Sequence, residues 1–138
     1  MRSSTGKQNI GVGLLVLAGF MIYGFYLIYA RDFAPDREAW IAGSAVAPHF
    51  EARLAHVHGN LFAVLNIVFG GLLLWLPLRE QRAKWVSWLA LAGFLMPIGI
   101  LAELYLGVPF YLVLVGAVSI VSATALLGWE VLRMRAAS

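Results

Sequence analysis

Long stretches without Asp, Glu, Lys or Arg divide this chain into four apolar segments. These uncharged stretches cover residues 8–30, 54–78, 85–102 and 104–129. A helix needs about 20 apolar residues to cross the hydrocarbon core of a bilayer, and each stretch comes close to or exceeds that length. None of them shows the period-two alternation of apolar and polar residues that is typical of a membrane β-strand. The pattern therefore predicts membrane-spanning α-helices.

Turn-forming residues separate the last two segments. Gly107-Val108-Pro109 is a turn signal, so we expect a tight connection there. The first segment is longer than the apolar region of a signal peptide and no small-residue cleavage site follows it, which favours a retained span. We expect an all-α, four-helix integral membrane bundle that forms one domain over residues 1–138. Its predicted helices cover about 10–30, 53–78, 85–106 and 109–132.

The composition agrees with a membrane protein. The chain is 62% hydrophobic and only 12% charged, whereas a soluble domain is about 45–50% apolar and about 25% charged. A soluble chain of 138 residues cannot bury so much apolar surface, so soluble globular and disordered proteins are both excluded. The net charge of +3 does not indicate nucleic acid, because the basic residues are spread around the apolar segments. Without cysteine, disulfides and thiolate ligands are also excluded.

The distribution of Lys and Arg predicts the orientation. Three basic residues, Arg31, Arg37 and Arg53, fall on one side of the predicted bundle. The positive-inside rule therefore places the opposite side, with both termini, in the cytoplasm of a bacterial-type inner (plasma) membrane. That side carries Arg2, Lys7, Arg79, Arg82, Lys84, Arg133 and Arg135.

Polar residues inside the predicted spans lie mostly in the outer half of the membrane. Ionisable groups in a bilayer cost free energy and indicate a functional site by default. The second helix runs inward and the third runs outward, so we expect His56 and Glu103 at similar depth. The residues concerned are His56, His58, Asn60, Asn66 and Glu103, with His49 and Arg53 at the outer rim.

Helical phase separates the two histidines of the second helix. At 100° per residue, His49, Arg53, His56 and Asn60 share one face, and His58 lies about 200° from His56. In a regular helix the two histidines therefore cannot bind the same metal ion. Neutral imidazole is a good metal or heme ligand. A hydrogen-bonding interfacial role is the alternative for either histidine.

Three further residues carry expectations. Glu103 has three possible roles: a proton-handling group, a partner for a histidine or Arg53, or a side chain that reaches the outer surface. Pro97 is expected to bend the third helix and to open space beside the second. Asn66 lies near mid-membrane, where we expect an interhelical hydrogen bond.

Several segments resemble a known family. They are Gly11-Val12-Gly13-Leu14-Leu15, Ala52-Arg53-Leu54-Ala55-His56, Leu65-Asn66 and Leu76-Pro77-Leu78. With the four-helix plan, they resemble styrene oxide isomerase and its relatives, which hold heme b and rearrange epoxides to carbonyls. The resemblance implies a homotrimer with heme between subunits and a small apolar substrate that enters from lipid. It implies that His56 is the axial ligand of the heme iron, which acts as a Lewis acid.

The same resemblance suggests roles for other residues. Arg53 would hold a heme propionate, His58 is a second candidate for heme contact, and Asn60, Glu103 and Tyr105 are candidate catalytic residues. The pattern departs from the family in two places. The family's asparagine lies six residues after its histidine, whereas Asn60 lies four after His56. The catalytic Asp and Tyr of the family's third helix have no clear match, although Glu103 and Tyr105 lie near that place.

A second likeness involves the second helix alone. Ala55-His56-Val57-His58-Gly59-Asn60-Leu61 is similar to the His-x-His-x-Asn-Leu segment of small four-helix proteins related to heme–copper oxidase subunit I. That likeness implies a heme redox or gas-binding subunit. A structural subunit and a small transporter, both without cofactor, are the remaining alternatives. The first segment lacks the glutamate that four-helix multidrug exporters carry there, which disfavours the transporter.

Overall fold

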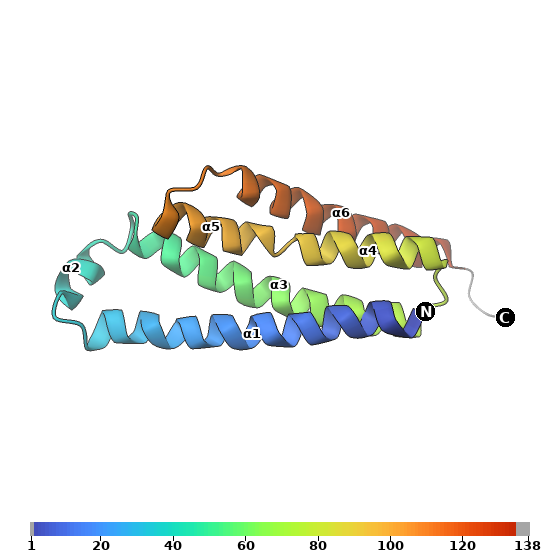
Figure 1. The fold of residues 1–138 in the computed structure, drawn as a ribbon, viewed down its shortest axis with the longest axis horizontal. Coiled ribbons are helices and arrows are strands. Elements are labelled where there is room, and N and C mark those ends of the chain that lie inside the picture. Colours follow the sequence, from blue (N-terminus) through green and yellow to red (C-terminus); the bar gives the residue numbers. More distant parts are fainter. Residues whose placement is uncertain (1, 135–138) are drawn as a thin grey trace.

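The computed structural model describes residues 2–134, and this part of the chain is helical without strands (Figure 1). Four segments are long and apolar enough to cross a membrane: Ser4–Asp32, His49–Trp75, Glu80–Leu106 and Tyr111–Arg133. The predicted all-α four-helix bundle is therefore confirmed. The helices are α1 (Arg2–Asp32), α2 (Arg37–Ala42), α3 (His49–Trp75), α4 (Glu80–Ala92), α5 (Leu95–Leu106) and α6 (Tyr111–Arg133).

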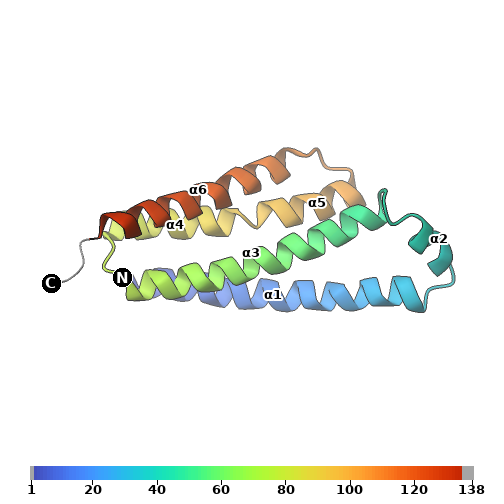
Figure 2. The same cartoon turned by 180° about the vertical axis from the view of Figure 1, so that it is seen from behind.

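The bundle has α3 at its centre and α1 along one edge. The helix α1 packs mainly on α3, which also packs on α4 and α5, and α6 covers the other side of α4 and α5 (Figures 1 and 2). The short helix α2 lies in the connection between α1 and α3, at the end of the bundle far from the N-terminus. In the following, that end is called the outer end.

Proline residues account for the end of α3 and for the break in the third span. Leu76 precedes Pro77 and is extended, which ends α3 after Trp75 rather than near residue 78. The third span begins at Glu80, five residues before the predicted 85, and is divided into α4 and α5. Pro97 has no N–H to donate to the carbonyl of Gly93, which instead accepts a hydrogen bond from the Met96 N–H at 3.0 Å. The expected bend is therefore present.

Small residues bring α1 and α3 into close contact. A Cβ atom added to Gly6 would lie 2.6 Å from the carbonyl oxygen of Gly70, and one added to Gly70 would lie 2.6 Å from that of Gly6. A Cβ on Gly13 would lie 2.9 Å from the carbonyl oxygen of Ala63. Such contacts are typical of membrane helices, where close backbone approach increases the van der Waals attraction.

The face of α1 turned away from α3 is apolar and uncovered. Leu15 is 76% exposed and Ile22 68%. In water such a surface would be unfavourable, but a bilayer is as apolar as these side chains. This face of α1 is therefore suited to the apolar interior of a membrane.

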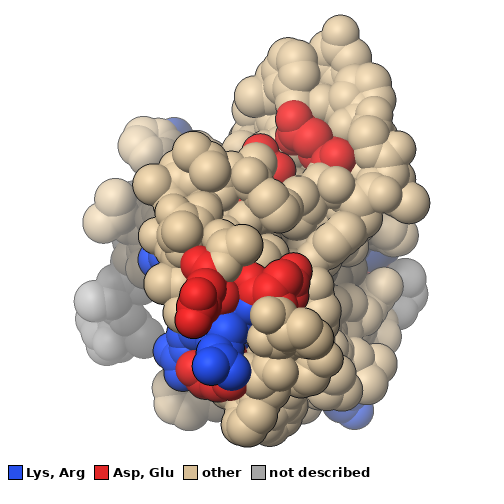
Figure 3. Space-filling model, turned by 90° about the vertical axis from the view of Figure 1, so that its left-hand side faces the viewer, with Lys and Arg blue, Asp and Glu red and all other residues tan. Residues whose placement is uncertain are grey.

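Charges at the two ends of the bundle differ in sign. Carboxylates gather at the outer end around a small group of basic side chains (Figure 3). Five of the seven acidic residues belong to this end: Asp32, Asp36, Glu38, Glu51 and Glu103. The start of α4 and the end of α6 carry Arg79, Arg82, Lys84 and Arg133. The distribution agrees with the orientation inferred from the positive-inside rule.

Candidate functional site

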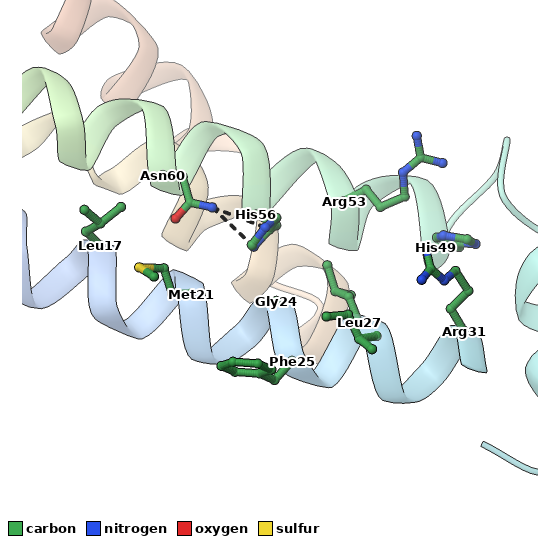
Figure 4. Close-up of a pocket in the computed structure, with 11 residues that line it drawn as sticks. Leu17, Met21, Gly24, Phe25, Leu27, Arg31, His49, Arg53, His56 and Asn60 are labelled. Atoms are coloured by element: carbon green, nitrogen blue, oxygen red, sulfur yellow. Dashed lines mark hydrogen bonds between the residues drawn. The ribbon is translucent and has the colours of Figure 1, made fainter. Parts of the chain in front are cut away.

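A groove of about 600 Å³ runs between α1 and α3 near the outer end. Figure 4 shows that most of its polar side chains come from α3, that Arg31 comes from α1, and that α1 supplies its apolar wall. The polar residues of α3 are spaced three or four apart, so they share the face that helical phase predicts. The groove is lined by Leu17, Met21, Gly24, Phe25, Leu27, Ile28 and Arg31 of α1 and by His49, Arg53, His56 and Asn60 of α3.

His56 lies in the middle of this groove, and its ring is hydrogen-bonded to α1 through Nδ1. Its Nδ1 lies 3.0 Å from the carbonyl oxygen of Phe20 on α1, and its Nε2 lies 3.2 Å from the side-chain nitrogen of Asn60. A carbonyl oxygen only accepts, so Nδ1 carries the proton and Nε2 of the neutral ring carries the lone pair. The Asn60 amide nitrogen lies 3.2 Å from Nε2 and 3.5 Å from Nδ1, and such similar distances place it off the axis of that lone pair.

Because Gly24 has no side chain, the His56 ring lies directly against α1. A Cβ atom added to Gly24 would lie 2.8 Å from Cε1 of His56 and 3.4 Å from its Nε2. Together with the bond to Phe20, this contact fixes the plane and direction of the ring. The lone pair of Nε2 therefore has one orientation relative to the groove.

Asn60 is incompletely hydrogen-bonded. Its amide nitrogen contacts both ring nitrogens of His56, at 3.2 and 3.5 Å, while its side-chain oxygen is buried and has no hydrogen-bond partner. Among the described residues, it is the one buried side-chain nitrogen or oxygen in this condition. Buried polar groups are normally paired, so such an atom calls for an explanation.

His58 lies on a different face of α3 from His56, as helical phase predicts. Its Nδ1 donates to the carbonyl oxygen of Leu54 in its own helix at 2.9 Å, and its ring meets Phe62 edge-on at 5.9 Å. It does not line the groove. The structure thus separates the two candidate histidines and leaves His56 as the one that faces the groove.

Three basic or aromatic groups surround the outer mouth of the groove. Arg53 is exposed and has no ion-pair partner among the described residues, whereas Arg31 pairs with Asp32 at 2.8 Å. His49 is buried; its Nδ1 donates to the carbonyl oxygen of Trp40 at 2.6 Å, and the two rings stack at 4.4 Å. The connection between α1 and α3 is thereby attached to the mouth of the groove through α2.

The structure does not bring the expected Glu103 into this site. Glu103 is exposed and does not line the groove. The hydroxyl of Tyr105, in contrast, lies 2.9 Å from that of Tyr23 on α1, whose ring centroid is 6.4 Å from that of His56. Because residues two apart lie about 200° apart on a helix, α5 turns only one of these two side chains towards α1. That residue is Tyr105.

A second polar cluster, which the sequence revealed only in part, joins α1, α3 and α4. Asn9 donates to the side-chain oxygen of Asn66 at 2.8 Å and to the carbonyl oxygen of Ser87 at 3.3 Å, and the Ser87 hydroxyl donates back to Asn9. The Asn66 amide donates to the carbonyl oxygens of Phe62 and Ala90.

The interhelical bond expected of Asn66 is therefore confirmed, and its partner Asn9 was missed. Asn9 lies at the edge of the first apolar segment, where a polar residue is usually taken to mark the membrane boundary. All three side chains of this cluster are buried, and each of their polar groups has a partner. The arrangement is that of a structural contact between helices.

Comparisons with known proteins identify no relative of this chain. No family model matches the sequence. No curated protein and no solved structure matches it either.

Proposed function

We propose that this chain is a multi-pass membrane protein that binds heme b in the groove between α1 and α3, with His56 as the iron ligand. The observation that carries the proposal is the state of the His56 ring. Its Nδ1–H donates to a backbone carbonyl oxygen, which leaves the lone pair on Nε2 of a ring that lines the groove. A histidine that ligates a metal commonly makes this bond with its other nitrogen, because the bond fixes the tautomer and the ring orientation.

The residues around His56 fit an amphipathic prosthetic group that bears carboxylates. Leu17, Met21 and Phe25 give the groove an apolar wall, and its volume of about 600 Å³ lies within the usual range for small-molecule sites. Arg53 has no ion-pair partner among the described residues and lies at the mouth, where its guanidinium group would pair with a propionate.

The resemblance noted in the sequence suggests the reaction, which is the isomerisation of an epoxide to a carbonyl compound. Heme iron supplies a Lewis acid when bound. The protein would hold the heme iron through His56, exclude water from the site with the apolar wall, and admit an apolar substrate from lipid. Tyr105, hydrogen-bonded to Tyr23 beside His56, is better situated for a polar role than Glu103.

The resemblance also implies an oligomeric state and a location for the protein. We propose a homotrimer in a bacterial-type inner membrane, with both termini in the cytoplasm. The open side of the groove and the uncovered apolar face of α1 support a neighbouring copy there, because together they leave a cofactor of this size incompletely covered.

The first test is whether the purified protein contains heme. The protein is expressed with ample heme precursor and purified, and its heme content is measured from the Soret band. We expect His56→Ala to lose the heme and His58→Ala to retain most of it, because His58 faces away from the groove. A colourless wild-type protein, or normal heme content in His56→Ala, overturns the proposal.

Activity is measured next on the coloured protein. With styrene oxide as substrate, we expect phenylacetaldehyde, detected by gas chromatography. If the heme is reversibly reduced at physiological potentials and no aldehyde forms, the electron-transfer or gas-binding role replaces the isomerase role.

A further inference from the structure

The connection between α1 and α3 contains a second, smaller cavity at the outer end of the bundle, here called the α2 cavity. Its volume is about 200 Å³, compared with about 600 Å³ for the groove that contains His56. The α2 cavity is lined by Asp36, Ala39, Trp40, Gly43, Pro48 and His49. Of the described residues, His49 alone lines both this cavity and the groove. The His49 side chain therefore forms a wall between the two.

The two cavities face different surroundings. The groove lies between two segments that are long and apolar enough to cross a membrane, Ser4–Asp32 and His49–Trp75. Around α2, in contrast, the charged side chains are exposed, and charged groups in a membrane protein normally remain in contact with water. They are Asp32, Asp36, Arg37 and Glu38. A path from water through the α2 cavity to the groove therefore has to pass His49.

Two contacts with Trp40 hold the His49 ring in this position. Its Nδ1 donates to the Trp40 carbonyl oxygen at 2.6 Å, and its ring stacks on the indole with 4.4 Å between centroids and 15° between planes. His49 is only 8% exposed, so other groups cover it on its remaining sides. Figure 4 shows it at the outer end of the groove, between Arg31 and Arg53. The ring thus fills the outer end of the groove.

The helix α2 has little other burial to hold it in place. None of its six residues is buried. A segment with few buried contacts opens at a low cost in free energy. The contact between Trp40 and His49 therefore contributes much of the attachment of α2 to α3, and without it the His49 ring is free to turn out of the groove.

From these contacts we propose that His49 closes the groove to water at the outer end, and that Trp40 holds it closed. Apolar molecules reach His56 from lipid through the open side of the groove, whereas water and charged solutes are excluded. His49 thereby restricts the substrates of the site to apolar compounds.

The closure also determines the product, and this part of the inference rests on the proposed isomerase function. If water reached an activated epoxide, its oxygen would bond to the benzylic carbon as the C–O bond there breaks. The proton released from water would pass to the freed oxygen, and the product would be a diol instead of an aldehyde. Exclusion of water from an active site prevents such side reactions.

The test of the closure does not require heme. The chain has no cysteine, so one introduced thiol reports on one position. Leu27→Cys places a thiol in the groove, and Val46→Cys places one at a position that is 62% exposed and outside both cavities. Each heme-free protein, in lipid nanodiscs, is treated with 2-sulfonatoethyl methanethiosulfonate, a charged reagent that does not enter lipid. Mass spectrometry gives the ratio of the Leu27→Cys rate to the Val46→Cys rate.

We expect this ratio to be well below one in the parent and to rise at least about tenfold with His49→Ala, which removes the hydrogen bond and the ring. His49→Phe should raise it less, because a ring that stacks on Trp40 remains. Trp40→Leu removes the stacking and should raise it about fivefold. If His49→Ala does not fold, Trp40→Leu replaces it. A ratio near one in the parent, or a ratio that His49→Ala leaves unchanged, overturns the proposal.

The products formed from styrene oxide separate the closure from the function. In the heme-loaded protein, we expect His49→Ala to raise the ratio of phenylethanediol to phenylacetaldehyde about tenfold, by the same factor as the labelling. If labelling rises but no variant forms aldehyde, the closure stands and the isomerase function fails. If aldehyde forms and labelling is unchanged, the function stands and the closure fails.

Discussion

Replacing Asn66 with leucine tests whether the buried asparagine cluster holds α1 and α4 to α3. The substitution removes the bond from Asn9 to the Asn66 oxygen at 2.8 Å and the bond from the Asn66 amide to the carbonyl oxygen of Ala90 at 2.9 Å. Both bonds connect different helices. Leucine is similar in size to asparagine, so the change affects the polar contacts more than the packing.

The expected loss follows from the value of each bond. Interhelical hydrogen bonds in membrane proteins contribute about 0.6 kcal/mol on average and up to about 1.7 kcal/mol. Two such bonds therefore amount to about 1–3 kcal/mol of the free energy of unfolding. The Asn9 amide then retains only the longer bond to the Ser87 carbonyl oxygen, while its own oxygen still accepts from the Ser87 hydroxyl. One buried amide hydrogen of Asn9 is therefore left without a partner.

The assay is reversible unfolding in mixed micelles, followed by helical circular dichroism. Asn60→Leu is the matched control, because it makes the same exchange on the same helix and breaks no bond to another helix. We expect it to change the free energy of unfolding by less than about 0.5 kcal/mol. If Asn66→Leu also lowers the free energy of unfolding by less than about 0.5 kcal/mol, the reasoning is refuted.

A double-mutant cycle then isolates the contact. Asn9→Leu and Asn66→Leu each break the same bond, so the double variant should lose less than the sum of the single losses. We expect a coupling free energy of at least about 0.5 kcal/mol, as for residues in one network. Strict additivity would mean that the two asparagines do not act together.

Three further predictions concern the groove. Gly24→Ala should lower heme affinity at least about tenfold by overpacking against His56, whereas Gly19→Ala, which meets nothing within 4 Å, should not change the Soret titration. Arg53→Gln should weaken binding of heme about fivefold and leave binding of heme dimethyl ester unchanged; equal effects on both would exclude a propionate contact. Glu103→Gln should preserve heme content and stability, because Glu103 is exposed and outside the groove; loss of heme in this variant would show that Glu103 belongs to the site.

The helices could be predicted from the sequence because bilayer thickness dictates the length of an apolar segment. The break at Gly93 was foreseeable from Pro97, and the separation of His56 from His58 follows from helical period alone. Boundaries were less accurate. The ends of α1 and α4 extend into charged residues, and a helix continues past the membrane wherever its backbone can still be hydrogen-bonded.

The chemistry of the candidate site depended on contacts between helices. Depth along the bundle placed Glu103 near His56, but depth does not specify the direction in which a side chain points. Only the packing of α5 on α3 determined that Tyr105 faces α1 and Glu103 does not. In the same way, Asn9 became part of a buried cluster only because Gly6 and Gly13 let α1 approach α3 so closely.

The sequence by itself thus determined the class of protein, the number of spans and the face of α3 that carries the polar residues. These properties depend on composition, length and helical period, which act along one segment at a time. The tertiary structure decided which nitrogen of His56 carries the proton, because the carbonyl oxygen that fixes it belongs to Phe20 on another helix. It also decided that Asn66 is fully bonded while Asn60 is not. Both outcomes depend on hydrogen-bond partners 24 to 57 residues away in the chain, which local pattern does not specify.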